Sequence, residues 1–186
     1  MRIIGGEFRG RRLASVGKGD AGAHLRPTAD RVRESLFNRL AGAFGNPFEG
    51  AVVLDLFAGT GALGLEALSR GAATAVFVEN GRTALRLLNR NIEICRVEDR
   101  MRVLRRDACK PGAPPGDPAT LVFLDPPYGK GLGEAALSAV LAGGWIAPGA
   151  LVVWEEGADI TPPNGLRLLD SRRYGDTVIH MLERSD

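Results

Sequence analysis

Hydrophobic and polar positions follow one regular pattern over most of the chain. From residue 51 onward, short apolar runs typical of buried strands are followed by segments in which apolar positions recur at helical spacing. The pattern predicts strands at residues 51–56, 74–79, 101–104, 121–125 and 150–155, and helices at residues 63–70, 82–94 and 133–141. Because strands that alternate with helices form parallel sheets with both faces covered, we expect an α/β fold with a mostly parallel sheet.

The two ends of the chain follow other patterns. Short apolar pieces around glycines at residues 2–13 are typical of a small β-hairpin. A helix is predicted from Thr28, a candidate N-cap, to Ala41, because apolar positions between them recur at helical spacing. Near the C-terminus, residues 166–173 and 177–182 predict a second hairpin, which adds an antiparallel strand to the edge of the sheet.

A glycine-rich loop follows the first strand of the regular pattern. Gly59, Gly61 and Gly64 match G-x-G-x-x-G, although a tight strand-to-helix turn alone produces the same match. Glu79 ends the next strand, at about the offset where an acidic side chain reaches ribose hydroxyls. Asp55 precedes the glycines, where a negative charge suits a cationic ligand better than a pyrophosphate. The predicted cofactor is therefore S-adenosylmethionine, which carries an amino group and a sulfonium.

The segment Asp125-Pro126-Pro127-Tyr128 follows an apolar strand and is the most specific motif in the chain. Two prolines fix φ and remove two N–H donors, so the backbone forms a rigid corner that presents carbonyl groups. Such a corner beside a carboxylate matches a planar amino group that donates two hydrogen bonds. Asp125 and the Pro126 carbonyl would accept them, and Tyr128 would stack on the base that carries the amino group.

Positive charge is concentrated at the N-terminus. Residues 1–39 hold nine Lys/Arg against four Asp/Glu, whereas the remainder holds fifteen against eighteen. The excess is almost all arginine, whose planar fork suits phosphate oxygens, so it favours a nucleic acid partner. A solvated arginine-rich face would show the same excess, and charge alone leaves both interpretations open.

Composition limits the class of protein. The chain has 186 residues, 45% hydrophobic and 25% charged, which fits one compact unit. We expect an RNA-binding hairpin and helix extension at residues 1–45 and a compact catalytic domain at residues 46–186. No apolar run is long enough for a membrane helix and the start lacks a signal peptide, so we expect a cytoplasmic protein with no membrane partner. Cys95, Cys109 and two histidines predict neither a metal site nor a disulfide.

Together, these motifs resemble those of class I S-adenosylmethionine-dependent methyltransferases. The run DLFAGTG at residues 55–61, Glu79, Asp107 and DPPY at residues 125–128 occur in the order of that superfamily. Within it, nearly the whole chain resembles the bacterial 16S ribosomal RNA guanine-N2 methyltransferases of the RsmD type. This narrower resemblance depends on four N-terminal segments, at residues 2–6, 9–13, 26–28 and 31–37. The Pro/Gly-rich loop at residues 110–118 departs from the family pattern.

The resemblance implies a Rossmann-like methyltransferase fold and three groups of site residues. The residues that would bind the cofactor are Asp55, Phe57, Gly59, Gly61, Glu79, Asn80, Asp107 and Ala108. The residues that would hold the guanine are Asp125, Pro126, Pro127 and Tyr128. The residues that would contact RNA are Arg2, Arg9, Arg11, Arg12, Arg26, Thr28 and Arg31. The implied partner is 16S ribosomal RNA in the small subunit or its assembly intermediate, and we expect a monomer.

Two alternatives stay open at this stage. A DNA adenine-N6 methyltransferase shares the DPPY motif, but it usually needs an added recognition domain, for which the residues outside the sheet are few. A non-catalytic RNA-binding module would keep the fold without the chemistry. Other classes fit less well: an NAD-dependent oxidoreductase lacks an obvious catalytic partner here, and a protein-glutamine methyltransferase has Asn in place of Asp125.

Overall fold

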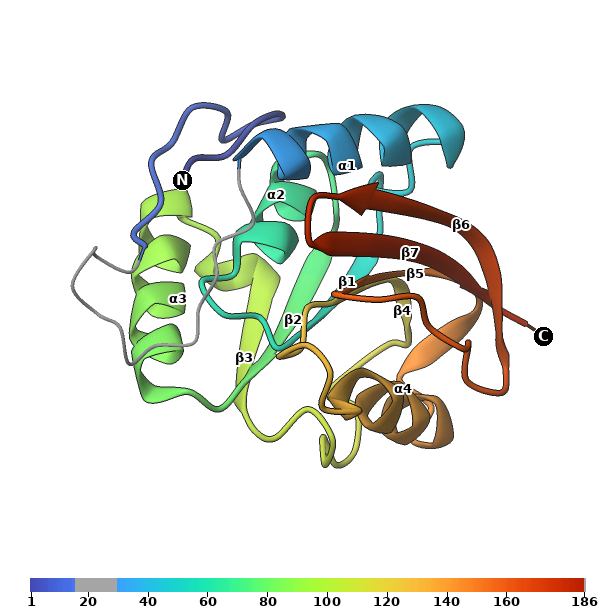
Figure 1. Ribbon diagram of the computed structural model, residues 1–186. Helices are drawn as coiled ribbons and strands as arrows, with labels where there is room; N and C mark the ends of the chain where they lie inside the picture. Colours follow the sequence, from blue (N-terminus) through green and yellow to red (C-terminus); the bar gives the residue numbers. More distant parts are fainter. Residues whose placement is uncertain (16–29, 186) are drawn as a thin grey trace.

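A computed structural model describes residues 1–15 and 30–185. Seven strands form one sheet in the order β3-β2-β1-β4-β5-β7-β6 (Figure 1). The strands are β1 (Val52–Leu56), β2 (Thr74–Glu79), β3 (Met101–Arg105), β4 (Ala119–Leu124), β5 (Ile146–Glu156), β6 (Leu166–Tyr174) and β7 (Thr177–Arg184). The first five are parallel, and β7 runs antiparallel to both β5 and β6. The predicted α/β fold with an antiparallel C-terminal hairpin is confirmed.

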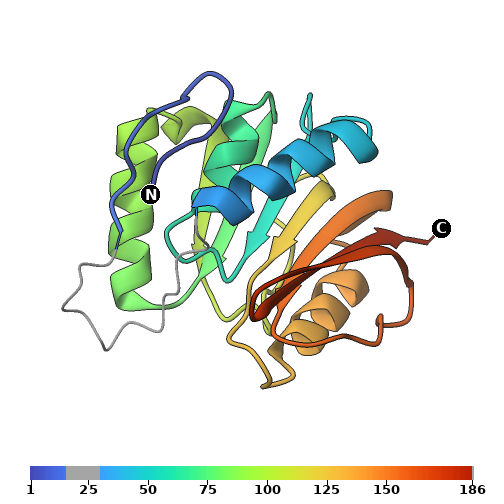
Figure 2. The same ribbon diagram turned by 45° about the horizontal axis from the view of Figure 1, so that its top comes forward.

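Helices cover both faces of the sheet. They are α1 (Asp30–Ala43), α2 (Ala62–Ser69), α3 (Arg82–Cys95) and α4 (Leu132–Ala142), with a 3-10 turn at Glu98–Arg100. The first three lie on one face and α4 lies on the other (Figures 1 and 2). Successive strand residues point to opposite faces, so Val53 joins the core under α1–α3 and Leu54 joins the core under α4.

The face that carries α4 is covered partly by loops. In the described chain no helix lies between β3 and β4, and the Pro/Gly-rich loop at residues 110–118 crosses this part of the face. The indole Nε1 of Trp145 donates to the Gly112 carbonyl at 2.9 Å, which holds the loop against the sheet. A second loop, residues 157–165, connects β5 to β6.

The N-terminal residues pack onto α2. The predicted hairpin is present as a single antiparallel bridge between Arg2 and Arg12 rather than as two full strands. Its apolar side chains, Ile3, Phe8 and Leu13, are buried in the same core as α1–α3. Residues 1–15 and the sheet therefore share a core, and the boundary placed at residue 45 stays a prediction.

Element boundaries shift most where the sheet is irregular. The register between β4 and β5 changes between Ala119 and Leu121, which pairs Ala119 with Ile146. For this reason β5 begins four residues earlier than its apolar run predicts. The predicted N-cap Thr28 lies outside the described residues. No helix in the described part of the chain is long and apolar enough to cross a membrane.

Candidate active site

The glycine loop joins β1 to α2 through a sharply turned backbone. Phe57, Gly59 and Gly61 all have positive φ, at 55°, 57° and 78°. For a bulky residue such as Phe57 this conformation is strained, and such strain is concentrated at functional sites. At Gly61 an added Cβ would lie 2.4 Å from Cδ1 of Leu88, so the loop also needs glycine in order to pack against α3.

Glu79, at the carboxyl end of β2, holds the glycine loop through its carboxylate. Its Oε2 accepts a hydrogen bond from the N–H of Gly59 at 2.8 Å. Its Oε1 accepts from the N–H groups of Asn80 at 2.8 Å and Gly81 at 2.6 Å. A carboxylate has about four acceptor positions, so these three donors leave room for a ligand hydroxyl. The geometry therefore fits the predicted contact with ribose.

Asp55 is a buried carboxyl group on β1, directly under the loop. Its Oδ2 accepts one hydrogen bond, from the N–H of Gly64 at 2.9 Å. Burial raises the pKa of Asp55 to about 8, against the smaller lowering effect of the Gly64 hydrogen bond. The charge of the neighbouring Glu79 carboxylate contributes to the same rise, after burial. A cation beside Asp55 would reverse this shift, so the site suits a positively charged ligand.

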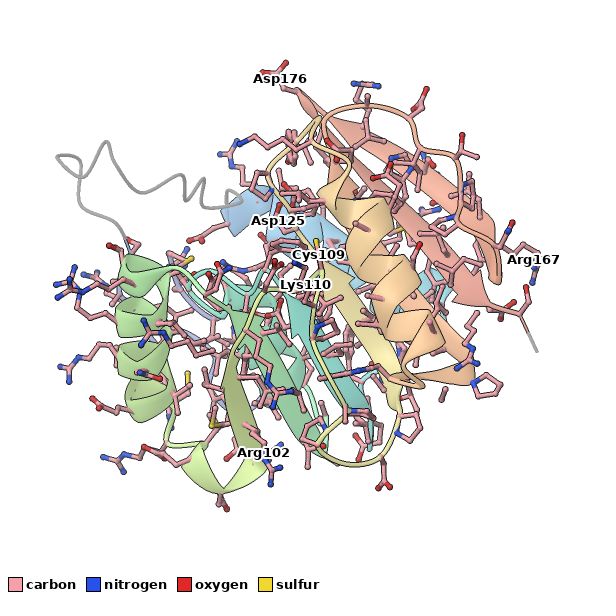
Figure 3. All side chains as sticks on the ribbon, turned by 90° about the horizontal axis from the view of Figure 1, so that it is seen from below. Arg102, Cys109, Lys110, Asp125, Arg167 and Asp176 are labelled. Carbon is pink, nitrogen blue, oxygen red and sulfur yellow. The ribbon has the colours of Figure 1, made fainter. Side chains whose placement is uncertain are left out.

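Asp107 and Ala108 follow β3 at the same edge of the sheet. The side chain of Asp107 is exposed, and its Oδ1 accepts from the N–H of Cys109 at 2.9 Å, which closes a local turn. Ala108 is buried among the residues of the α4 face. The predicted adenine contacts of both residues stay predictions. Figure 3 shows Cys109 and Lys110, which follow them, with Asp125 at this end of the sheet.

The Asp125–Tyr128 corner is held by the ends of two neighbouring strands. The Tyr128 hydroxyl donates to Oε1 of Glu155 on β5 at 2.6 Å and lies 2.9 Å from the Thr177 hydroxyl on β7. Behind the ring, a Cβ added to Gly157 would lie 3.0 Å from Cδ2 of Tyr128, so only glycine fits there easily. Pro126 is buried and Pro127 is exposed.

Carboxylates gather around the corner from three strands. The pKa of Asp125 is raised well above its usual range, first by burial and then by the negative charges of Glu155, Asp55 and Glu156. Burial and the hydrogen bond to Glu155 also raise the pKa of Tyr128. The crowded carboxyls disfavour one another's ionised forms, so the site suits a cation or a donor-rich group that would stabilise them.

Sequence reasoning missed Glu155, Glu156 and Thr177. Glu156 accepts from the N–H groups of Gly129 at 3.1 Å and Gly157 at 2.8 Å, which ties the residues after the corner to the end of β5. Two adjacent acids at the carboxyl end of an apolar strand were a signal for the glutamates. Nothing local marked Thr177, because it reaches the site only through the antiparallel placement of β7.

The residues predicted to contact RNA fall into three sets. Arg2, Arg9, Arg12 and Arg31 are exposed, whereas Arg26 and Thr28 lie outside the described residues. Arg11 is different, because its Nη1 donates to the carbonyls of Ile94 at 3.1 Å and Cys95 at 2.7 Å at the C-terminal end of α3. Its guanidinium also lies 4.8 Å from the centre of the Phe8 ring. Arg11 thus has a structural role, and its RNA contact stays a prediction.

Within residues 1–15 and 30–185, no group of three or more His, Cys, Asp or Glu side chains is arranged to hold a metal ion.

Comparison with known proteins places the chain among methyltransferases. The family described as Conserved hypothetical protein 95 matches residues 1–183. Ribosomal RNA small subunit methyltransferase D of Escherichia coli (strain K12) is 43% identical over 155 residues, which cover 83% of this chain and 74% of the relative. The protein of the same name from Haemophilus influenzae is 37% identical over 171 residues, or 88% of this chain and 84% of the relative. A solved Escherichia coli structure, described as a candidate methyltransferase named yhhF, has a TM-score of 0.83 at 39% identity and covers 100% of this chain and 98% of that one.

The sheet order, the antiparallel strand β7 and the glycine loop after β1 define a class I methyltransferase fold. Within this class, the chain belongs to the Conserved hypothetical protein 95 family, which is the RsmD family. The resemblance seen in the sequence motifs is thereby confirmed.

Proposed function

We propose that this protein transfers a methyl group from S-adenosylmethionine to the exocyclic N2 amino group of a guanine in 16S ribosomal RNA. The observation that carries the proposal is the position of the Asp125–Tyr128 corner directly beside the glycine loop. Residues Leu56 and Leu124, which end β1 and β4, are partners in parallel register, so the loop and the corner leave the sheet side by side. The names of the two curated relatives support ribosomal RNA of the small subunit as the substrate class.

The residues under the loop fit S-adenosylmethionine. The Asp55 carboxylate would lie beside the positively charged amino group of the cofactor. The Glu79 carboxylate has acceptor capacity left for the ribose hydroxyls. Asp107 and Ala108 would border the adenine. When bound, the cofactor supplies an electrophilic methyl group on a positively charged sulfur. The raised pKa values of Asp55 and Asp125 support this fit, because both reflect carboxyls removed from bulk water that a cation would stabilise in the charged form.

The corner would orient the guanine amino group. An exocyclic amino group is a weak nucleophile, because its lone pair is delocalised into the ring. If Asp125 and the Pro126 carbonyl each accept one N–H, the nitrogen is held with its lone pair toward the methyl group. The carboxylate also stabilises the positive charge that grows on nitrogen during transfer. Tyr128 would stack on the base, and its hydrogen bond to Glu155 keeps the ring in one orientation.

The exposed N-terminal arginines would position the RNA. The side chains of Arg2, Arg9 and Arg12 are solvent-exposed and would contact RNA phosphates. Phosphate contacts fix the position of the RNA on the protein without reading its base sequence. A small-subunit RNA substrate would place the activity in the cytoplasm, and we propose that the protein acts there as a monomer.

Transfer of labelled methyl groups tests the proposal. The substrates are small ribosomal subunits from a strain that lacks this gene, the same RNA stripped of protein, and duplex DNA. We expect label in the RNA of the subunits, recovered as N2-methylguanosine. Asp125→Ala should abolish the label but leave RNA binding intact, whereas Asp117→Ala, which alters an exposed loop residue, should match the wild type. Methyladenine in DNA alone would instead indicate a DNA methyltransferase, and no label in any substrate would indicate an RNA-binding module.

A further inference from the structure

The side chain of Asn91 joins two parts of the protein that are far apart in the sequence. Asn91 lies on α3 and is completely buried. Its Oδ1 accepts from the backbone N–H of Ala14 at 2.7 Å, and its Nδ2 donates to the Ala14 carbonyl at 3.1 Å. The same Nδ2 donates to the carbonyl of Thr60 at 2.9 Å. Asn91 therefore links the N-terminal segment to the glycine loop.

The Thr60 carbonyl is in the middle of that loop, between the two glycines with positive φ. The loop is held at one side by Glu79, which accepts from Gly59, and at its far end by Asp55, which accepts from Gly64. The Asn91 side chain holds the centre of the glycine loop, through its hydrogen bond to the Thr60 carbonyl. The Thr60 hydroxyl also lies 3.7 Å from Sδ of Met1, so the N-terminal segment contacts the loop a second time.

The N-terminal segment is itself firmly attached. Glu66 on α2 accepts from the N–H groups of Ile4 at 2.7 Å and Gly5 at 2.9 Å. The Ser69 hydroxyl donates to the Gly5 carbonyl at 2.6 Å and accepts from the N–H of Phe8 at 2.8 Å. Ala14 follows these anchors and directly precedes the part of the chain that contains Arg26 and Thr28.

We propose that Asn91 is a positioning residue that couples cofactor binding to RNA binding. RNA that engages the N-terminal segment would restrain Ala14 beyond its hydrogen bonds to Asn91, and Asn91 would pass this added restraint to the Thr60 carbonyl and the loop. A linkage of this kind is reciprocal, so RNA must tighten cofactor binding by the same factor by which cofactor tightens RNA binding. The inference rests on the proposed function, because it takes S-adenosylmethionine and small-subunit RNA as the two ligands.

Calorimetric titration of the full chain with S-adenosylhomocysteine tests this coupling. The titration is made on the protein alone and on the protein saturated with small ribosomal subunits from a strain that lacks this gene. We expect the subunits to tighten binding about fivefold or more in the wild type. Asn91→Asp keeps the acceptor for Ala14 but removes both donors, and it should reduce the tightening to less than twofold. Asn89→Ala, on the exposed face of the same helix, is the matched control and should behave like the wild type.

The outcomes separate the coupling from the proposed function. If the wild type binds no S-adenosylhomocysteine and methylates no RNA, the proposed function fails. If it binds and methylates, but the subunits leave its affinity unchanged or Asn91→Asp keeps the full tightening, the coupling is wrong. Because Asn91 variants can fail to fold, hydrogen exchange on the wild type gives an independent test. S-adenosylhomocysteine should slow exchange in a peptide that contains the Ala14 amide, and unchanged exchange there would also overturn the coupling.

Discussion

Glu155 accepts a 2.6 Å hydrogen bond from the hydroxyl of Tyr128, and this contact joins the end of β5 to the Asp125–Tyr128 corner. The same hydroxyl lies 2.9 Å from Thr177 on β7. An aromatic ring held in this way has one orientation before the substrate arrives. Because the ring is already oriented, less entropy is lost when the ring and a stacked base reach the reactive geometry.

Tyr128→Phe should therefore lower kcat while leaving the ring available for stacking. We expect a decrease of about tenfold in kcat, with a smaller change in the KM for RNA, because the base is still bound but is held less rigidly. Tyr174→Phe is the matched control, since Tyr174 is the other tyrosine of the chain and contacts Ser35 instead. Steady-state kinetics with subunits as substrate make the comparison. A wild-type kcat for Tyr128→Phe would show that the hydroxyl plays no part.

Asp55→Asn should stabilise the protein increasingly as the pH rises. The folded pKa of Asp55 is about 8 against an ordinary value of 3.8, so ionisation opposes folding. The protonated Asp55 carboxyl contributes favourably to the free energy of unfolding. This contribution is fully present below pH 3.8 and is lost as the pH rises through 8. Asparagine does not titrate, and on the scale of 1.36 kcal/mol for each pKa unit the gain over wild type should reach roughly 6 kcal/mol at pH 9.

Urea unfolding at pH 5, 7 and 9 measures this difference. The other raised carboxyl, Asp125, is present in both proteins, but the charge of Asp55 contributes to its raised pKa, so Asp55→Asn also removes that contribution, with the same sign. Asp117→Asn, at an exposed position, should show no such dependence. A stability difference between Asp55→Asn and wild type that is the same at all three pH values would contradict the assignment.

Glu79→Ala should weaken cofactor binding, because it removes the acceptor for Gly59 and for the predicted ribose contact. The expected loss is about 1–3 kcal/mol, the range for a hydrogen bond to a charged group. Calorimetry with S-adenosylhomocysteine gives the affinity, and Glu98→Ala on the exposed 3-10 turn is the control. An affinity equal to that of the wild type would exclude Glu79 from the binding site.

Arg11 and Arg12 are neighbours with different expected roles. Arg11→Ala should lower the free energy of unfolding by about 1–2 kcal/mol, because it removes the donor to two carbonyls at the end of α3. Arg12→Ala should leave stability unchanged and weaken RNA binding, with a shallower dependence on salt, because its side chain is exposed. Thermal unfolding and filter binding at two salt concentrations distinguish the two variants. Equal effects on RNA binding without loss of stability would assign both residues to the RNA surface.

Local pattern determined the elements and the two motifs of this protein. The runs that form β2 and α3 are visible in the sequence because period-two and 3.6-residue repeats are properties of neighbouring residues. The glycine loop and the Asp125–Tyr128 corner are likewise contiguous, so both motifs are visible in the sequence before their positions in the fold are known. The prediction that Asp55 faces a cationic ligand likewise depends only on its place before the glycines.

Only the tertiary structure decided which distant residues complete the site. Thr177 reaches Tyr128 because β7 inserts antiparallel beside β5, and Asn91 reaches both Ala14 and Thr60 because α3 packs between them. The same packing places the Arg11 guanidinium at the C-terminal end of α3, where it donates to the Cys95 carbonyl. Strand order, register and side-chain burial depend on contacts between residues far apart in the chain, and no repeat in the local sequence encodes them. The raised pKa of Asp55 has the same origin, because burial exists only in the folded protein.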